Sequence, residues 1–432
     1  MLLNSNSTTA ASPNPLTLDH LIAPALDVLQ NYVRGVRRDI PLHDARFVRF
    51  GIARVLSQSV SGRDFLQLQR EVQADELAKS TCFDSLHSPR RLQVLSQLSA
   101  EVAHRHRQEL PDLLANFPEF KHRRVYAVDG QHICHAVHAA RDPKGEYVSV
   151  NSMYLTCLHS GLLENFAAVQ GDGERRHEMP VFRRRMADWL RNRSFDHRKS
   201  PPILVVDMAY VDTDYWTRIL FLKEKGAQVI TREKENMKAT VMGHPQWDKS
   251  ATVNQGVLHD EHVGYGNSRL MRRVTYQDPE TGTVFKFLTT VMDLAPGLIA
   301  LLYLLRWRIE KIFDTTKNKL QETKAWANGT VAQDIQAHLL ALTHNLLMLI
   351  RAQLARDHQI QETKVEEKRA VAMKYRLEKA ARVAMRVAEY HGKLPGIVQL
   401  TVQFIRTIRN GILSKTPWVM LLEPLRRSME SY

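Results

Sequence analysis

Four residues near position 310 carry side chains suited to metal and phosphate chemistry. Tyr303, Arg306, Glu310 and Lys317 combine a phenol, two cations and a carboxylate. At 100° per residue, a helix places all four within a sector of about 60°, so they form one stripe along its surface. Such a stripe can serve a metal ion and phosphates, although the same residues could instead form a solvated, salt-bridged helix face.

Two aspartates distant from this stripe in the sequence each follow an apolar, strand-like run. Asp129 follows residues 125–128, and Asp207 follows the fully apolar residues 202–206. Each strand is expected to end at its aspartate and to leave the carboxylate at the edge of a sheet. If both meet Glu310, the three carboxylates would repel one another unless divalent cations lay between them. Oxygen ligands favour Mg2+ or Mn2+, and two such ions per site are what phosphodiester cleavage requires.

The elements around these residues indicate an α/β domain. Strands are predicted at 124–129, 147–150, 153–158, 202–207 and 227–231, with helices at 179–191 and 212–224. Three strands, helix, strand, helix, strand is the order of a ribonuclease-H-like domain. Asp212 and Asp214 lie at a predicted helix start, where capping explains them. A long helix that carries the stripe is expected to begin at Pro296.

The remaining sequence predicts helical flanks and a β-rich insertion. The predicted divisions are a disordered segment 1–16, a helical DNA-binding domain 17–120, the core's first part 121–231, the insertion 232–296, the core's final helices 297–348, and a basic helical region 349–432 for DNA contact and dimerisation. In the N-terminal domain, Arg90 and Arg91 follow Pro89. This pair suits a helix that reads DNA, and equally a plain helix hairpin with a solvated basic face.

Composition favours a nucleic-acid partner. The 432 residues include 60 Lys+Arg and 46 Asp+Glu, a net charge of +14, and basic side chains placed at phosphates release condensed counterions. The last 82 residues carry 16 Lys+Arg against 8 Asp+Glu, so they hold +8 of this charge. Three widely spaced cysteines exclude a disulfide framework, and no signal peptide or membrane-length apolar run is evident, which predicts a soluble, cytoplasmic protein.

The combination of motifs resembles a known family. Tyr303-x2-Arg306-x3-Glu310-x6-Lys317 matches the YREK signature of insertion-sequence transposases of the IS-four type, the branch that includes the Tn-five transposase. The run that ends in Asp207, with Tyr210 after it, and the strand that ends in Arg232 look like that family's second-acid block. Residues 125–130 look like its first. The likeness covers roughly residues 123–348.

The resemblance implies a DDE transposase. Asp129, Asp207 and Glu310 would bind two Mg2+ or Mn2+ ions that drive cutting at the element's ends and joining of the 3' ends to target DNA. Tyr303, Arg306 and Lys317 would hold phosphates of the terminal nucleotides.

By the same resemblance, the second strand would be cut through a DNA hairpin, and a homodimer would pair the two ends. Arg232 is a further predicted DNA contact, whereas Trp247 in the insertion is left out of the site. Two alternatives stay open: a domesticated DNA-binding protein, and a ribonuclease-H-like nuclease without strand transfer.

Overall fold

A computed structural model describes most of the chain. It covers residues 18–32, 40–57, 61–71, 79–134, 150–170, 178–192, 201–220, 226–265, 270–278, 281–314, 324–357, 404–411, 416 and 418–430. The segment predicted as disordered, Lys317, and much of the predicted basic C-terminal region lie outside the described residues. None of the described helices is long and apolar enough to cross a membrane.

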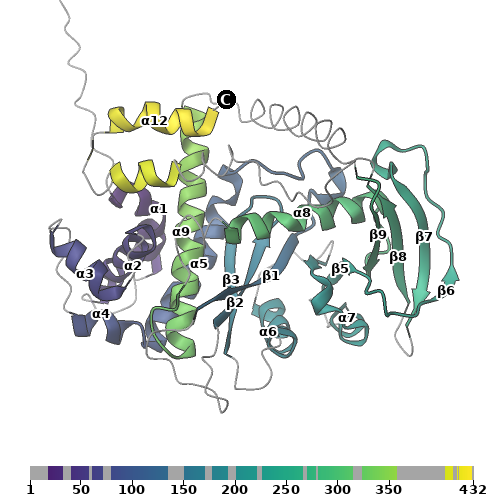
Figure 1. Cartoon of the computed structure of the whole chain (residues 1–432), viewed down its shortest axis with the longest axis horizontal. Coiled ribbons are helices and arrows are strands. Elements are labelled where there is room, and N and C mark those ends of the chain that lie inside the picture. Colours follow the sequence, from purple (N-terminus) through teal and green to yellow (C-terminus); the bar gives the residue numbers. More distant parts are fainter. Residues whose placement is uncertain are drawn as a thin grey trace, which may run out of the picture.

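One nine-stranded mixed sheet organises the described chain (Figure 1). Its strands are β1 (Val125–Ile133), β2 (Val150–Cys157), β3 (Leu163–Gln170), β4 (Ile203–Val206), β5 (Gln228–Arg232), β6 (Thr240–Gly243), β7 (Val257–Gly264), β8 (Met271–Gln277) and β9 (Val284–Thr289). Their order across the sheet is β3-β2-β1-β4-β5-β9-β8-β7-β6. Strands β1, β4 and β5 run parallel, and β1, β2 and β3 form an antiparallel meander.

The meander differs from its prediction in one respect. Residues 153–158, predicted as the third strand, belong mainly to β2, and the third strand is β3. The sequence does not reveal this because β3 contains Glu164, Asn165 and Gln170, so its apolar alternation is weak. Asn345 of α9 (Thr330–Asp357) bonds both backbone groups of Leu163, at 2.8 Å each, and holds the start of β3.

The segment predicted as a β-rich insertion continues the same sheet. Strand β9 pairs antiparallel with β5, with Ile230 opposite Thr289 and Arg232 opposite Phe287. Strands β8, β7 and β6 follow outward from β9. The insertion therefore occupies the free edge of β5 rather than building a sheet of its own, because that edge offers unpaired backbone groups.

Helices cover both faces of the sheet (Figure 1). Helices α6 (Glu178–Asn192) and α7 (Thr213–Leu220) pack on one face through a core that includes Phe182, Met186 and Trp216. Helix α8 (Pro296–Asp314) and helix α9 pack on the other face. Alternate residues of the buried strands point to opposite faces, so both cores draw on β1, β4 and β5.

Five helices precede the sheet in the described chain, and the first, second and fifth of them share its core. They are α1 (Leu18–Tyr32), α2 (Ile40–Ser57), α3 (Gly62–Glu71), α4 (Lys79–Ser85) and α5 (Pro89–His106). Helix α9 packs against α1, α2 and α5 as well as against β3, and it runs through the boundary predicted at 348/349. A helix over 404–411 and α12 (Trp418–Glu430) complete the described chain.

Two arginines considered as DNA contacts have partners within the fold. Arg90 makes a bidentate ion pair with Asp44 at 2.8 and 2.6 Å, and the Arg91 guanidinium lies 4.5 Å from the centre of the Phe47 ring. Ser88 caps α5, accepting the Arg91 backbone N–H at 3.4 Å. These contacts tie α5 to α2, so the arginine pair stabilises a helix packing rather than forming only a solvated basic face.

Two buried histidines of α9 predict an acid-sensitive fold. Burial lowers the pKa values of His338 and His344 to about 4, below the ordinary value near 6.5. As the pH falls from about 6.5 towards 4, the unfolded chain binds protons that the folded chain excludes, so the free energy of unfolding falls. The expected loss is up to about 1.4 kcal/mol per pH unit for each histidine.

Urea unfolding between pH 7.5 and 4.5 measures this loss. The His338→Leu variant should show a shallower dependence of the urea midpoint on pH than the intact protein, whereas substitution of the exposed His87 should leave the dependence unchanged. Identical pH dependence in His338→Leu and the intact protein would contradict the prediction.

Candidate active site

Two aspartates meet where parallel strands diverge. The register of β1 and β4 ends at the pair Val128 and Val206, and Asp129 and Asp207 are the next residue on each strand. The side chains are 21% and 35% exposed, so both carboxylates lie at the surface of the sheet edge. The expected meeting of these two acids is therefore present in the structure.

Backbone donors fix both carboxylates. Asp129 Oδ1 accepts the N–H of Gly130 at 2.9 Å, and Asp207 Oδ2 accepts the N–H of Ala209 at 3.3 Å. The prediction that Asp129 ends its strand is wrong, because β1 continues to Ile133 with β2 as its partner. Asp207 does directly follow its strand and begins a short 3-10 turn, Met208–Tyr210.

Helix α8 crosses the sheet above these acids. Near its middle, Tyr303 lies 4.9 Å from Phe287 of β9, measured between ring centres, and near its end Phe313 lies 5.6 Å from Tyr154 of β2. Arg306 and Glu310 belong to the two turns between these anchors. The crossing direction is visible in Figure 1, where α8 runs from the β9 side towards β1 and β2.

The start of α8 is fixed by a close backbone approach. Gly297 donates its N–H to Asn254 at 3.0 Å, and a Cβ at this position would lie 1.7 Å from the Val253 carbonyl oxygen. Only glycine allows this contact without a backbone shift. The helix is thereby held at one end by the segment before β7.

Arg306 connects the helix to both acids. Its Nη1 lies 3.1 Å from Asp129 Oδ2 and donates a hydrogen bond to it, and its Nη2 lies 3.8 Å from Asp207 Oδ1. The arginine side chain is only 4% exposed. A buried guanidinium shared by two carboxylates offsets much of their mutual repulsion.

Tyr303 lies beside this ion pair. Its ring centre is 5.3 Å from the Arg306 guanidinium, and the tyrosine is 4% exposed. Burial raises the pKa of Tyr303, while the charge of Arg306 lowers it and that of Asp207 raises it. The alternative of a solvated, salt-bridged face is therefore wrong for Tyr303 and Arg306, which face the sheet.

Arg232 lies at the same edge of the sheet. It is the last residue of β5, the next parallel strand after β4, and its Nη2 lies 3.8 Å from the sulfur of Met208. Met208 directly follows Asp207 and is 38% exposed. The end of β5 thus places a cation beside the second acid.

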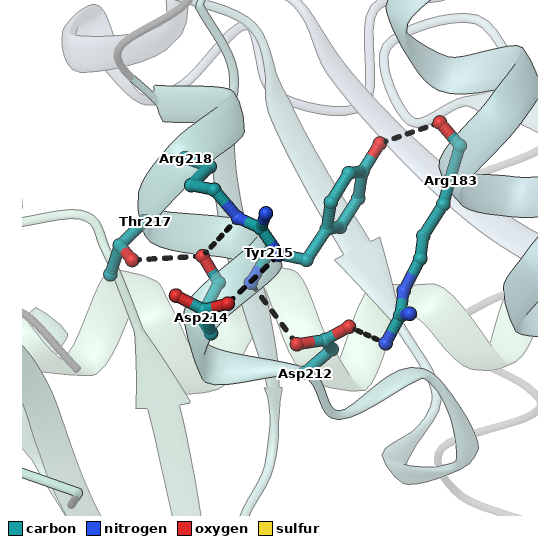
Figure 2. Close-up of polar contacts among 6 residues, drawn as sticks. All are labelled: Arg183, Asp212, Asp214, Tyr215, Thr217 and Arg218. Atoms are coloured by element: carbon teal, nitrogen blue, oxygen red, sulfur yellow. Dashed lines mark hydrogen bonds and ion pairs between the residues drawn. The ribbon is translucent and has the colours of Figure 1, made fainter. Parts of the chain in front are cut away.

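The segment that follows Asp207 is anchored by polar contacts, shown in Figure 2. Asp212 caps α7, accepting the Tyr215 backbone N–H at 3.0 Å, and it also pairs with Arg183 of α6. The Tyr215 hydroxyl donates to the Arg183 carbonyl at 3.1 Å. The capping role predicted for Asp212 is confirmed, and Asp214 instead pairs with Arg218 at 2.8 Å.

A comparison with protein families identifies the family of this chain. Residues 121–346, more than half of the chain, match the family described as the transposase DDE domain. The chain belongs to this family. It follows that the protein is a DNA-cleaving and strand-transfer enzyme. A search of curated proteins found no relative that matches. The mixed α/β sheet with its covering helices is consistent with a ribonuclease-H-like DDE transposase domain.

The donor set of this DDE transposase suits a divalent metal ion. DDE transposases typically use divalent metals, and the two aspartates supply adjacent, partly exposed oxygen ligands of the kind that Mg2+ and Mn2+ prefer. Within the described side chains, no three metal-binding groups come together. Glu310 lies in α8 one turn after Arg306, but its side chain is outside the described part of the structure, as is all of Lys317.

The sequence did not predict the contact between Arg306 and the acids of the DDE transposase. Its spacing from Glu310 indicated a helix face, whereas the family resemblance implied a phosphate as its partner. The backbone donors of Gly130 and Ala209 were also missed.

Proposed function

We propose that this protein is the transposase of a bacterial insertion sequence, of the IS-four type with the YREK signature. It binds the ends of its element, cuts them by metal-dependent hydrolysis and joins the 3' ends to target DNA. The observation that carries the proposal is the adjacency of Asp129 and Asp207 on parallel strands, with α8 laid across them. That helix bears Tyr303, Arg306 and Glu310.

In this mechanism the three acids would hold the metal. Asp129 and Asp207 would hold it from the sheet, and Glu310 from α8. Two divalent cations, when bound, would activate water or a DNA 3'-hydroxyl and stabilise the leaving oxygen. The backbone N–H groups of Gly130 and Ala209 orient the aspartates by occupying one oxygen of each. The other oxygen of each aspartate would then be the one that binds a metal ion.

The cations around the acids contact DNA phosphates. The proposed contacts are Arg306 of α8 and Lys317, which follows that helix in the sequence, and Arg232 extends the basic surface from the end of β5. Tyr303 packs behind Arg306 and supports its position. The second strand is cut through a hairpin on the transposon end, which needs a terminal base turned out of the stack.

The assembly that acts on DNA is a homodimer in a paired-end complex. Each protomer binds double-stranded DNA, both inverted-repeat ends and target, and the region from Arg351 onward supplies DNA and partner contacts. The excess charge of +8 in these residues supports this role. The protein acts in the cytoplasm, at the nucleoid.

Joining of a cut end to new DNA tests the proposal. A duplex with the sequence that flanks the gene, cut in advance to expose its 3'-hydroxyl, is incubated with the protein, Mg2+ and a supercoiled plasmid. We expect covalent joining to the plasmid and, with uncut duplex, hairpinned ends on a denaturing gel. Cutting without joining would favour a ribonuclease-H-like nuclease, and binding without either product would favour a domesticated DNA-binding protein.

A further inference from the structure

Arg306 occupies the position that a divalent cation needs. Its guanidinium lies 3.1 Å from an oxygen of Asp129 and 3.8 Å from an oxygen of Asp207, and it is nearly excluded from solvent. Each aspartate uses its other oxygen to accept a backbone N–H. The oxygens that face Arg306 are thus the ones that a metal ion would take.

The charges of the site disfavour the simultaneous presence of Arg306 and metal ions beside the acids. Asp129, Asp207 and Glu310 supply three negative charges, and Arg306 neutralises one of them. Two divalent cations alone exceed the charge of the three acids, so a guanidinium held in place beside them would be repelled. A phosphate of DNA provides the negative charge that an arginine released from the acids requires.

We propose that Arg306 changes partners during the reaction. In the metal-free protein it binds Asp129 and Asp207, and when metal and DNA enter it moves to a DNA phosphate. This step rests on the proposed metal site of the three acids and on the proposed phosphate contact of Arg306. The guanidinium, whose carbon lies 5.3 Å from the centre of the Tyr303 ring, turns from the carboxylates to the phosphate.

The exchange couples metal binding to DNA binding. Without DNA, a metal ion must displace Arg306 from its ion pair, so its affinity is low. With DNA, the phosphate takes the arginine and the carboxylates become available. Because coupling is reciprocal, metal should also tighten the binding of the DNA end by the same factor. The protein would thereby avoid assembling its cutting site before DNA is present.

Binding of Mn2+ in the absence of DNA tests the exchange, measured by electron paramagnetic resonance of the free ion. The Arg306→Gln variant should bind Mn2+ about tenfold more tightly than the intact protein, because the competing cation is gone. The matched control is Arg232→Gln, which removes an arginine at the same edge whose described contact is the Met208 sulfur. It should change the affinity by less than about threefold.

A second readout separates exchange from a general effect of charge. Without metal, Arg306→Gln leaves the two aspartates to repel each other, so Mn2+ should raise its melting temperature more than that of the intact protein. Equal affinities of Arg306→Gln and the intact protein, or an equal gain in Arg232→Gln, would overturn the proposal. If Arg306→Gln does not fold, Arg306→Lys replaces it. The lysine ammonium is a point charge and bridges two carboxylates less well than a guanidinium, so this variant should bind Mn2+ roughly threefold more tightly than the intact protein. An unchanged Mn2+ affinity would overturn the exchange.

Failure of the exchange is distinguishable from failure of the proposed function. The double variant Asp129→Asn with Asp207→Asn should lose Mn2+ binding whether or not Arg306 moves. If the intact protein and this double variant bind Mn2+ alike, even with DNA, the metal site itself is wrong. If the double variant loses Mn2+ while Arg306→Gln behaves as the intact protein does, only the exchange is wrong.

Discussion

The Asp207→Asn variant is expected to cut DNA at least about a thousandfold more slowly than the intact protein. Asparagine keeps the size of the side chain and an oxygen for the Ala209 N–H, but it removes the charge that holds a divalent cation. Asp129→Asn should behave in the same way, because Asp129 lies beside Asp207 on the adjacent strand. The rate of cutting of a labelled duplex in Mg2+ measures both variants.

The matched control for these variants is Asp214→Asn. Asp214 lies in the first turn of α7, and its side chain is 73% exposed and pairs with Arg218. This substitution removes the same charge from a nearby surface and should leave the cutting rate within about twofold of the intact protein, because exposed charges interact weakly. Equal losses in Asp207→Asn and Asp214→Asn would show that net charge, rather than the metal site, sets the rate.

The largest effect on stability is expected from Asp260→Ala. Asp260 of β7 and Arg272 of β8 form a bidentate ion pair at 2.8 and 2.6 Å, with side chains 0% and 4% exposed. Arg272 also donates to the Leu294 carbonyl at 2.6 Å, just before α8. Removal of the carboxylate leaves a buried guanidinium without its counter-ion, so the free energy of unfolding should fall by about 3–5 kcal/mol. Urea unfolding at neutral pH measures the change.

Two controls show whether the buried charge causes this loss. The double variant Asp260→Ala with Arg272→Met removes the uncompensated charge and should recover part of the stability. Glu423→Ala breaks the exposed pair of Glu423 with Arg427 on α12 and should leave the urea midpoint unchanged. A midpoint for Asp260→Ala equal to that of the intact protein would contradict the prediction.

The central strands and the acids could be predicted because their signals are local. Residues 203–206 are apolar without interruption, which is typical of a strand buried on both faces, and the structure buries all four. The acid directly after them then lies at the sheet edge by necessity. Helix α8 was also predicted, because Pro296 marks its start and its apolar residues recur at helical spacing.

Strand β7 could not be predicted because its own residues do not show a strand pattern. It contains Asp260, Glu261 and two histidines, so it has no apolar alternation. Asp260 is buried only because Arg272 of the next strand neutralises it. Such a strand looks like a solvated loop until its neighbour is known.

Helix α9 shows the same limit in another form. It is buried over most of its length, between β3 and the N-terminal helices, and its buried residues include Gln336, His338 and Asn345. A helix enclosed on several sides has no single apolar face, so periodicity does not mark which side packs on the sheet. The sequence therefore suggested a boundary at 348/349, within the helix.

The contact of Arg306 with the acids was missed because Arg306 and Asp129 lie 177 positions apart in the sequence.

The most direct test of the three-acid site is the cutting of DNA by the Glu310→Ala variant. A duplex that carries the gene's own flanks is incubated with the intact protein or with the variant, in Mg2+ and in Mn2+, and binding is measured on the same duplex by gel retardation. We predict that the variant binds the duplex as the intact protein does but does not cut it with either ion. Equal cutting by the two proteins would contradict the site formed by Asp129, Asp207 and Glu310.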